Sequence, residues 1–323
     1  MQSSPTTFYI ASAVGLGVAA TAPLFISHGF LLYMLSLSVI GAIIATGLNI
    51  TNGYLGILNL SVGGQVALGS YVCALTALAD VPVPVAIVLA VAAGAALAFV
   101  TFLLFARLTG FFFGLATIAA AEVVRLMIRN LDTITHGMRG VRGYPPLAQS
   151  PAITYWLLLA ALAAVLLLVS LLVHSSIGLR WRAIRENANK ALSLGLPVRR
   201  LQLAGYTLAG AVMSFGGALL ALLLQYIEPG IAGLNTLVQT VLMVALGGGG
   251  TILGPVIGAL AITLIPEFLR VANELRLVIY GMTLIVVVLA VPGGVVGTFN
   301  RVMRTRRRLA AIRTTKGATG CPQ

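Results

Sequence analysis

The sequence predicts an all-α fold: a polytopic transmembrane helical bundle of about 8–10 spans that carries one short cytoplasmic helix. Of the 323 residues, 59% are hydrophobic and 8% are charged, whereas soluble domains carry about 25% charged residues. The mean hydropathy is +1.04. Several stretches reach the ~20 apolar residues that a helix needs to cross a bilayer. We therefore expect the chain to be embedded in a membrane.

Ten apolar segments are expected to enter or cross the membrane, because each is long enough for a helical span or for a re-entrant segment. The segments at 62–79 and 253–269 are the candidates for short or re-entrant spans. In chain order, the ten segments lie near residues 8–27, 31–50, 62–79, 84–106, 111–128, 152–173, 201–226, 235–250, 253–269 and 276–292.

We expect the whole chain, 1–323, to form a single transmembrane domain. Its parts are the N-terminal spans in 1–174, a cytoplasmic segment in 175–200, the C-terminal spans in 201–300 and a basic cytoplasmic tail in 301–323.

Positive charge gives the expected orientation. The 20 Lys and Arg residues outnumber the 7 Asp and Glu residues, and most of them lie in two clusters, at 180–200 and at 301–316. Basic loops beside membrane spans stay in the cytoplasm, so both clusters are placed inside and nucleic acid is not an expected partner. Four crossings between the clusters, and six before residue 175, then put both termini in the cytoplasm.

Three arginines do not fit this orientation. Arg129, Arg139 and Arg142 lie between the fifth and sixth segments, on the side that the count places outside. Either the count is wrong by one crossing, or these arginines face outward for a reason, such as contact with an acidic partner.

Glycine is concentrated in three stretches, 53–71, 245–259 and 291–297, among the 36 glycines of the chain. Glycine in a membrane helix usually serves close packing, but four consecutive glycines form a poor helix. A turn or hinge is therefore expected here. The predicted hinge residues are Gly247, Gly248, Gly249, Gly250, Gly254 and Pro255.

The segment SSIGLRWRAIRENANKALSLGLP (175–197) is a charged island between apolar spans. Its apolar residues recur at spacings of three and four, which predicts one amphipathic helix. Glu186 and Lys190 stand in the favourable i,i+4 order, and Gly195 followed by Pro197 is a stop signal. Such a helix could lie on anionic lipid or insert its apolar stripe into a groove of a cytoplasmic partner. The stripe consists of Ile177, Trp181, Ile184, Ala188 and Ala191.

The stretch IGLRWRAIRENANKALSLGLP resembles the cytoplasmic coupling segment in the membrane subunits of branched-chain amino-acid ABC importers. Four further stretches resemble motifs of that family in the same order, so that the likeness covers roughly 35–298. These are TGFFFGLATIAAAEVVRLMIRN (109–130), LAGAVMSFGGALLA (208–221), ALGGGGTILGPVIGAL (245–260) and YGMTLIVVVLAVPGGVVG (280–297).

The resemblance implies that the charged island couples this chain to an ATPase. Motion of the island as a lever is then expected to drive alternating access through the glycine hinges, and Ile184→Asp or Arg185→Glu is expected to uncouple ATPase activity from transport without unfolding the protein. The coupling residues carried over are Ile177, Gly178, Arg180, Trp181, Ile184, Arg185, Glu186, Asn187 and Gly195.

One segment departs from the family pattern. Relatives often have G-Y-x-G-x-x-S-L-G-H, whereas this chain has GYLGILNLSV, with Asn59 at the Ser position and Val62 at the His position. If this segment touches the substrate, urea, short amides or aromatic acids are alternatives to a branched-chain amino acid.

The chain itself lacks the means to hydrolyse ATP. A phosphate-binding P-loop needs G-K-[S/T], and neither Lys190 nor Lys316 stands in that context. We expect no catalytic residue and no cofactor in this chain, and the two cysteines suggest no metal site. The resemblance implies two separate ATP-binding subunits, a second homologous permease and a periplasmic or surface-anchored substrate-binding protein in a prokaryotic cytoplasmic membrane.

Two other classes of protein stay open. An ion-coupled secondary transporter usually places carboxylates within its spans, but only Glu122 is expected deep in a span here, three residues before Arg125. A membrane scaffold without transport activity would leave the amphipathic helix unexplained.

Candidate substrate contacts are the polar residues within spans. Glu122 could pair with Arg125 or line the translocation path. At a separate site, Arg139 and Arg142 could bind acidic residues on the surface of the substrate-binding protein. The path candidates are Asn49, Asn59, Gln65, Thr117 and Glu122.

Overall fold

The computed structural model describes residues 29–268. The segments expected at 8–27 and 276–292, and the basic tail at 301–323, lie outside the described residues. The described elements, in chain order, are α2 (Gly29–Asn49), η1 (Ile50–Leu55), α3 (Val62–Leu78), α4 (Val83–Phe105), α5 (Gly110–Asn130), α6 (Asp132–Thr135), η2 (Gly137–Arg139), β1 (Val141–Arg142), α7 (Pro151–His174), α8 (Ser176–Glu186), α9 (Ala188–Ser193), α10 (Val198–Leu224), β2 (Tyr226–Ile227), η3 (Pro229–Ala232), α11 (Leu234–Gly247) and α12 (Gly254–Phe268).

The all-α expectation is confirmed, because the strands of the described residues amount to one two-residue pair. Five helical segments are long and apolar enough to cross a membrane: α2 continued by η1, then α4, α5, α7 and α10. The helices α3, α11 and α12 are apolar but shorter. The sequence correctly singled out the third and ninth segments as short, but the eighth segment, α11, has only 14 residues and is short as well.

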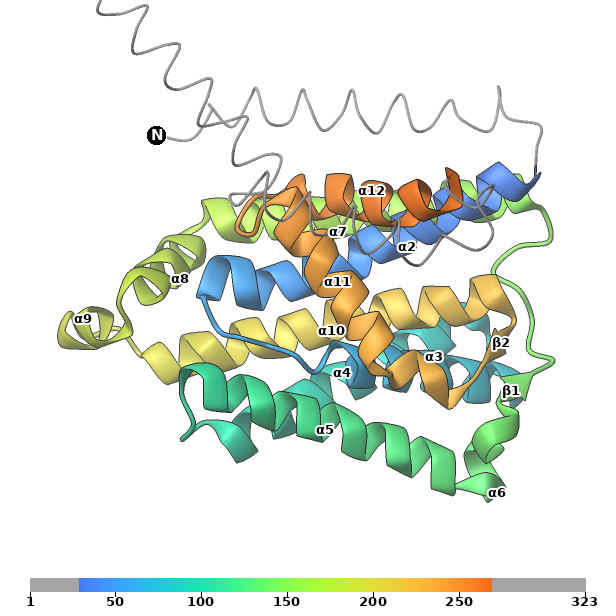
Figure 1. The fold of residues 1–323 in the computed structure, drawn as a ribbon, viewed down its shortest axis with the longest axis horizontal. Helices are drawn as coiled ribbons and strands as arrows, with labels where there is room; N and C mark the ends of the chain where they lie inside the picture. The colour runs from blue at the N-terminus through green and yellow to red at the C-terminus, as the bar shows by residue number, and fades with distance from the viewer. Residues whose placement is uncertain (1–28, 269–323) are drawn as a thin grey trace, which may run out of the picture.

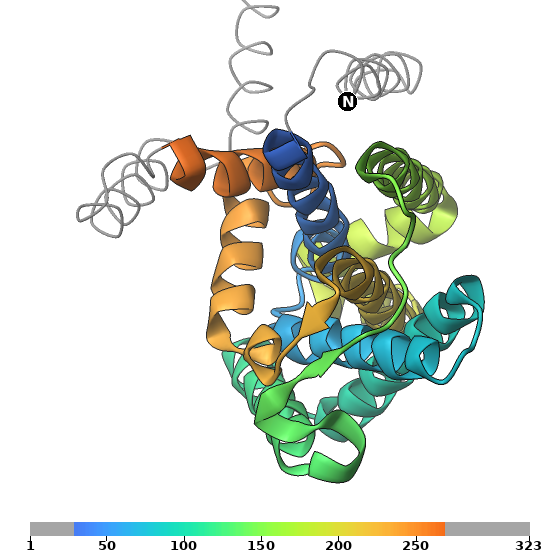
Figure 2. The same ribbon diagram turned by 90° about the vertical axis from the view of Figure 1, so that its right-hand side faces the viewer.

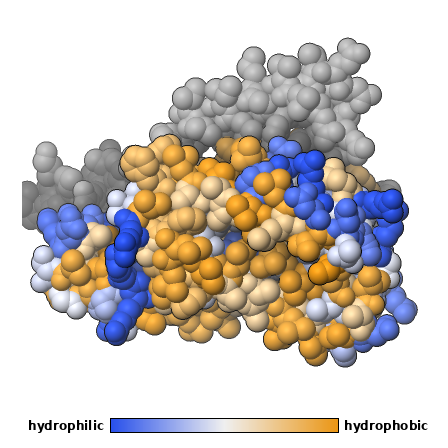
Figure 3. Space-filling view, turned by 90° about the horizontal axis from the view of Figure 1, so that it is seen from below, coloured by the Kyte–Doolittle hydropathy of each residue, from blue (hydrophilic) through white to orange (hydrophobic). Residues whose placement is uncertain are grey.

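Helices run between two ends of the molecule (Figure 1). The helices α8 and α9 lie at one end, and the β1–β2 pair lies at the other end with the loop that precedes α7. The arginine-containing loop and the charged island are therefore at opposite ends, as the sequence predicted. In Figure 3 an apolar belt lies between hydrophilic patches at the two ends.

The helix α10 lies near the centre of the bundle, against α2, α3 and α4 (Figures 1 and 2). Glycines allow this close approach: a Cβ on Gly69 of α3 would lie 2.7 Å from the Cα atom of Ser214, and a Cβ on Gly217 would overlap the backbone of Val66. Small residues serve the same purpose wherever membrane helices pack closely. Two large side chains of α10 are fully buried as well: Tyr206 packs on Phe102 and Phe113, and Met213 lies against Gly47 of α2.

Two helices, α3 and α11, begin inside the bundle and not at its ends. After η1 the chain runs without regular structure through 56–61 before α3 begins. After β2, the short helix η3 precedes α11, and a Cβ on Gly63 of α3 would overlap the carbonyl oxygen of Ala232 in η3. Irregular backbone at membrane depth is tolerated only where it is buried in protein or lines a water-filled cavity.

Candidate coupling and translocation sites

The charged island forms two helices, which corrects the expectation of a continuous one. The helix α8 ends at Glu186, and Asn187 adopts an extended conformation (φ −162°, ψ 105°). The side chain of Asn187 caps α9, because its Oδ1 atom accepts a hydrogen bond of 3.0 Å from the backbone N–H of Lys190. An Asn side chain favours such a cap over a helix interior. The break separates Glu186 from Lys190, and the two side chains form no ion pair.

Three of the five residues of the apolar stripe face the chain's own core and are not free for a partner's groove, whereas Ile177 and Ala188 are exposed. Trp181 and Ile184 of α8 are buried, as is Ala191 of α9. The indole Nε1 of Trp181 donates a hydrogen bond of 3.2 Å to the carbonyl oxygen of Leu201 in α10. Ile184→Asp would therefore bury a carboxylate and destabilise the fold, which corrects the expectation that this substitution would leave folding intact.

The outward surface of α8 and α9 consists of other residues. Leu179 is 64% exposed, Leu192 63% and Leu194 79%, and exposed basic and amide side chains surround them. The buried part of the predicted stripe therefore packs inside the chain, and the most exposed apolar side chains of this segment are leucines outside that stripe.

Arg185 reaches from α8 to two distant parts of the chain. Its guanidinium donates a hydrogen bond to the carbonyl oxygen of Gly53 in η1. A Cβ on Gly56 would lie 2.9 Å from its Cγ atom, and a Cβ on Gly250 would lie 2.5 Å from its Nη1 atom. The arginine side chain therefore lies between the end of η1 and the glycine-rich turn, where side chains larger than glycine would displace it.

The glycines 247–250 form a turn, as the sequence predicted. The helix α11 ends at Gly247, and Gly248 (φ 106°) and Gly250 (φ 81°) adopt a backbone conformation that favours glycine. The helix α12 begins at Gly254, whose N–H donates 3.1 Å to Thr251 Oγ1, and Pro255 is its second residue. A role of this turn as a hinge stays a prediction.

Asn49 holds the glycine turn against α2. Its Nδ2 atom donates to the carbonyl oxygen of Thr251, and its Oδ1 atom accepts from the N–H of Gly250, each at 2.8 Å. The side chain is fully buried. Asn49 therefore has a structural partner on both of its polar atoms and presents no surface to a substrate in this conformation.

Asn59 and Thr117 serve the irregular segment 56–61. Thr117 Oγ1 accepts a hydrogen bond of 3.0 Å from the N–H of Leu60, and Asn59 Oδ1 accepts from both the N–H and the hydroxyl of Ser61. Tyr206 of α10 also donates to Asn59 Oδ1, at 3.2 Å. These side chains satisfy backbone groups that a helix would otherwise satisfy.

Asn52, Ser61 and Tyr206 belong to the same network but were not singled out from the sequence. Asn52 Oδ1 accepts a hydrogen bond of 2.9 Å from the N–H of Asn59, which closes the irregular segment back onto η1. One local signal could have pointed to this arrangement: the Asn-Gly dipeptide at 52–53 is typical of a break in regular structure.

Gln65 lies apart from this network, on α3. Its side chain is fully buried, and neither its Nε2 nor its Oε1 atom has a hydrogen-bond partner. A Cβ on Gly210 would lie 3.1 Å from Oε1, so the amide faces the backbone of α10. The four uncharged path candidates are thus all buried within this chain and divide among three places.

Glu122, the fifth path candidate, is paired with Arg125, as the sequence allowed. The guanidinium contacts both carboxylate oxygens, with Nε at 3.0 and 2.9 Å. The pair is partly exposed, at 43% for the Glu122 side chain and 33% for Arg125. Glu122 borders a narrow cleft of about 10 Å³ between α5, the start of α3 and the start of α11.

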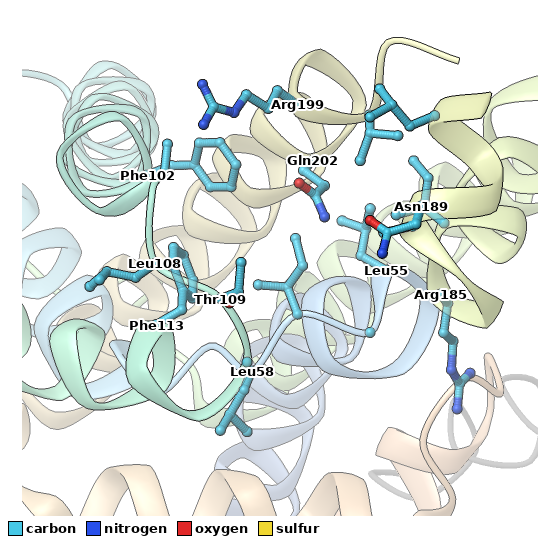
Figure 4. Close-up of a pocket in the computed structure, with 18 of the residues that line it drawn as sticks. Leu55, Leu58, Phe102, Leu108, Thr109, Phe113, Arg185, Asn189, Arg199 and Gln202 are labelled. Carbon is cyan, nitrogen blue, oxygen red and sulfur yellow. The ribbon is translucent and has the colours of Figure 1, made fainter. Parts of the chain in front are cut away.

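A larger cavity of about 1020 Å³ opens beside α8 and α9 (Figure 4). Phe102 of α4, Phe113 of α5 and Leu108 in the loop between them line it on one side. Asn189 and Gln202 line it from α9 and α10. Phe102 and Phe113 pack on Tyr206, whose hydroxyl bonds to Asn59. The cavity reaches the irregular segment itself, because Gly56, Ile57 and Leu58 line it beside Phe102 and Phe113.

Arg139 and Arg142 are exposed at the end opposite to α8 and α9. The guanidinium of Arg142 lies 5.1 Å from the centre of the Tyr226 ring, a cation–π contact. The pairing of β1 with β2 holds this loop against the segment that follows α10. Tyr144 in the same loop donates to the carbonyl oxygen of Ala221, and burial raises the pKa of its phenol.

The comparisons with known proteins agree with this architecture. Residues 30–288 match the family model described as branched-chain amino acid transport system / permease component. The high-affinity branched-chain amino acid transport system permease protein LivM of Escherichia coli (strain K12) is 28% identical, over 87% of this chain and 73% of LivM. LivM of Salmonella typhimurium is 26% identical, over 86% of this chain and 72% of LivM.

No solved structure matches this chain. The family model covers most of the chain, from α2 through all described helices, and the described helices form the multi-pass membrane fold that a permease requires. The chain therefore belongs to the family of permease components of branched-chain amino acid transport systems.

Proposed function

We propose that this chain is the membrane-spanning subunit of a binding-protein-dependent ABC importer that carries branched-chain or related amino acids. Two separate ATP-binding subunits would supply the energy, and a second homologous permease and a substrate-binding protein would complete the complex. The family membership and the names of the LivM relatives support the substrate class. In this proposal the chain is no enzyme, binds no cofactor and lies in a prokaryotic cytoplasmic membrane with both termini inside.

The observation that carries the proposal is the two-sided character of α8 and α9. Their inner side is fixed by Trp181 to α10 and by Arg185 to η1 and the glycine turn. Their outer side presents Leu179, Leu192 and Leu194. If an ATPase subunit binds the outer side, its motion would be transmitted to the irregular segment 56–61 and to the glycine turn, because Arg185 contacts both.

Alternative substrates rest on the departure at Asn59 and Val62. Both residues are fully buried, and the Oδ1 atom of Asn59 is occupied by Ser61 and Tyr206. The departure therefore changes packing around the irregular segment and not a surface that a substrate reaches in this conformation. Urea, short amides and aromatic acids stay secondary candidates. Ion coupling is disfavoured, because the guanidinium of Arg125 already holds the carboxylate of Glu122.

The experiment is assembly and import with the outer side of the helix pair altered. In the double variant Leu192→Asp/Leu194→Asp, we expect the ATP-binding subunits to be lost from the purified complex and ATP-driven import into proteoliposomes to fall to background. The control is Leu131→Asp, an exposed leucine at the opposite end. Unchanged assembly in the double variant would contradict the coupling role, and import that a protonophore abolishes while ATP is intact would favour ion coupling.

A further inference from the structure

The Glu122–Arg125 pair lies at a depth where charge is costly. Glu122 is the thirteenth of the 21 residues of α5, so it lies about 18 Å from the first residue and about 12 Å from the last. A charged side chain at the centre of a membrane helix costs about 2.5–3.5 kcal/mol on insertion scales. Pairing reduces this cost, but both side chains keep part of their surface exposed.

Other helices show what a lipid-facing surface of this protein looks like. The exposed residues of α4 are all apolar, and its one hydroxyl residue, Thr101, is buried. On α7 the same holds up to the terminal His174, with Thr154, Tyr155 and Ser170 buried. On α5 the Glu122–Arg125 pair departs from this pattern, whereas the nearby Val123, Leu126 and Met127 are exposed and apolar. The contrast therefore sets apart only the side of α5 that carries the ion pair.

The neighbouring helix α11 repeats this polar character. Asn235 and Gln239, one turn apart, are both exposed beside the apolar Leu234 and Val238. Both α5 and α11 lie on one side of the bundle, whereas α7 and the start of α4 lie on the other (Figure 2). A span that exposes amides and an ion pair is typical of a wall that faces water.

The two interrupted segments meet at the same place. The start of α3 touches η3, the short helix before α11, through Gly63 and the carbonyl oxygen of Ala232, and both residues border the cleft beside Glu122. In many secondary transporters, helices that are interrupted near the bilayer midplane form the substrate site, because their backbone groups are available there. The meeting of these breaks beside an ion pair is thus an independent indication of a transport path.

We propose that the face of α5 and α11 is this subunit's wall of the water-filled translocation path, and that Glu122 and Arg125 contact a zwitterionic substrate there. The inference rests on the proposed function and adds the site. An α-ammonium group would approach the carboxylate of Glu122, and an α-carboxylate would approach Arg125. The apolar side chain of the substrate would lie against Ile118, Leu234 and Leu237, which border the cleft.

The cleft holds about 10 Å³ in this structure, the volume of about one water molecule. The cleft beside Glu122 is therefore too small for a substrate in this conformation, while the Glu122 side chain itself is partly exposed. A substrate would be admitted when the start of α11 moves away from α3, and the glycine turn at the far end of α11 lies against Arg185 of the coupling helix. The helix α11 thus borders the cleft at its start, and the turn at its other end contacts Arg185 of α8.

The test is the water accessibility of single cysteines in the assembled complex. In a background with Cys73→Ala and Cys321→Ser, the probe is Leu234→Cys on α11 and the matched control is Leu167→Cys on α7, since both leucines are more than half exposed. A second control is Ala96→Cys on α4, also exposed. A charged, membrane-impermeant methanethiosulfonate reagent reacts with thiolates in water, so we expect the probe to react at least about tenfold faster than both controls.

Equal reaction of probe and controls, or no reaction of the probe, would overturn the proposal, because the α11 surface would then lie in lipid or against another protein. The labelling does not depend on what is transported, so it separates the two proposals. A fast-reacting probe in a complex that imports no amino acid would leave the path wall standing and reject the proposed substrate class. Import with equal labelling would reject the path wall alone.

Discussion

Two pairs of membrane helices in this protein differ in what they expose. The pair α4 and α7 presents valine, leucine, alanine and phenylalanine along its exposed surface, whereas α5 and α11 add the Glu122–Arg125 pair, Asn235 and Gln239. In Figure 2, α11 lies on the left above α5, and α7 lies on the right above α4. All of α4, α5 and α7 qualify as membrane spans by length and hydropathy, although α5 is the least apolar of the three.

The difference teaches where the membrane ends and the path begins. Lipid offers no hydrogen-bond partner, so an exposed amide or charge facing it loses its water without replacement. The same groups facing a water-filled path keep part of their hydration. Four predictions test whether the two faces differ in this physical sense.

The largest effect is expected from a carboxylate on the apolar face. Ala164→Asp places a charge on the exposed middle of α7, at a cost of about 2.5–3.5 kcal/mol on insertion scales. We expect the amount of folded protein in the membrane to fall severalfold. Leu234→Asp on α11 is the comparison variant, and it should accumulate normally because water in the path would keep the carboxylate hydrated, with a further small contribution from the first turn of a helix. Equal losses in both variants would remove the distinction between the faces.

A second effect is expected when the ion pair loses one member. Arg125→Leu leaves the Glu122 carboxylate without its partner, at a cost of about 1–3 kcal/mol. The double variant Glu122→Gln/Arg125→Gln removes both charges and should be more stable than Arg125→Leu when thermal unfolding of the purified protein is measured. Import of a zwitterionic amino acid should nevertheless fall in both. A double variant with normal import would show that the pair serves stability alone.

The third prediction concerns the contact between the interrupted segments. Gly63→Ala would place a Cβ against the carbonyl oxygen of Ala232, so α3 and η3 must separate. Overpacking of this kind costs about 1–3 kcal/mol, and we expect a lower thermal stability together with altered accessibility of Leu234→Cys. Gly29→Ala is the control, because a Cβ there meets no atom within 4 Å. Unaltered accessibility would indicate that the contact does not close the cleft.

The smallest effect is expected from a single amide of the path wall. Gln239→Leu removes an exposed polar group from α11, and its effect on stability should stay within about 0.5 kcal/mol. Loss of one hydrogen bond to water or substrate, about 1 kcal/mol, corresponds to at most about a fivefold decrease in import. Val238→Leu, at the neighbouring exposed position, should import normally. An equal decrease in both variants would point to packing and not to the amide.

Local sequence patterns predicted most helices correctly, because each apolar run must satisfy its backbone internally in a membrane. Expected bounds such as 84–106 and 111–128 differ by few residues from α4 and α5. The glycine turn and the pairing of Glu122 with Arg125 were also predictable, since both depend on residues within four positions of each other. The failure was the charged island: its periodicity predicted one helix, but the cap formed by Asn187 ends α8 at Glu186.

The composition and the order of motifs by themselves determined that this chain is a multi-pass helical permease, because hydropathy and local spacing are properties of neighbouring residues. Tertiary structure alone decided what each polar residue does. Asn49 binds the glycine turn 201 positions away, Arg185 reaches Gly53 at 132 positions, and Tyr206 covers Asn59 at 147. Such contacts depend on how the helices pack against one another, and the spacing of neighbouring residues in the sequence does not reveal that packing. Packing likewise placed Glu122, alone of the predicted path residues, on an exposed face.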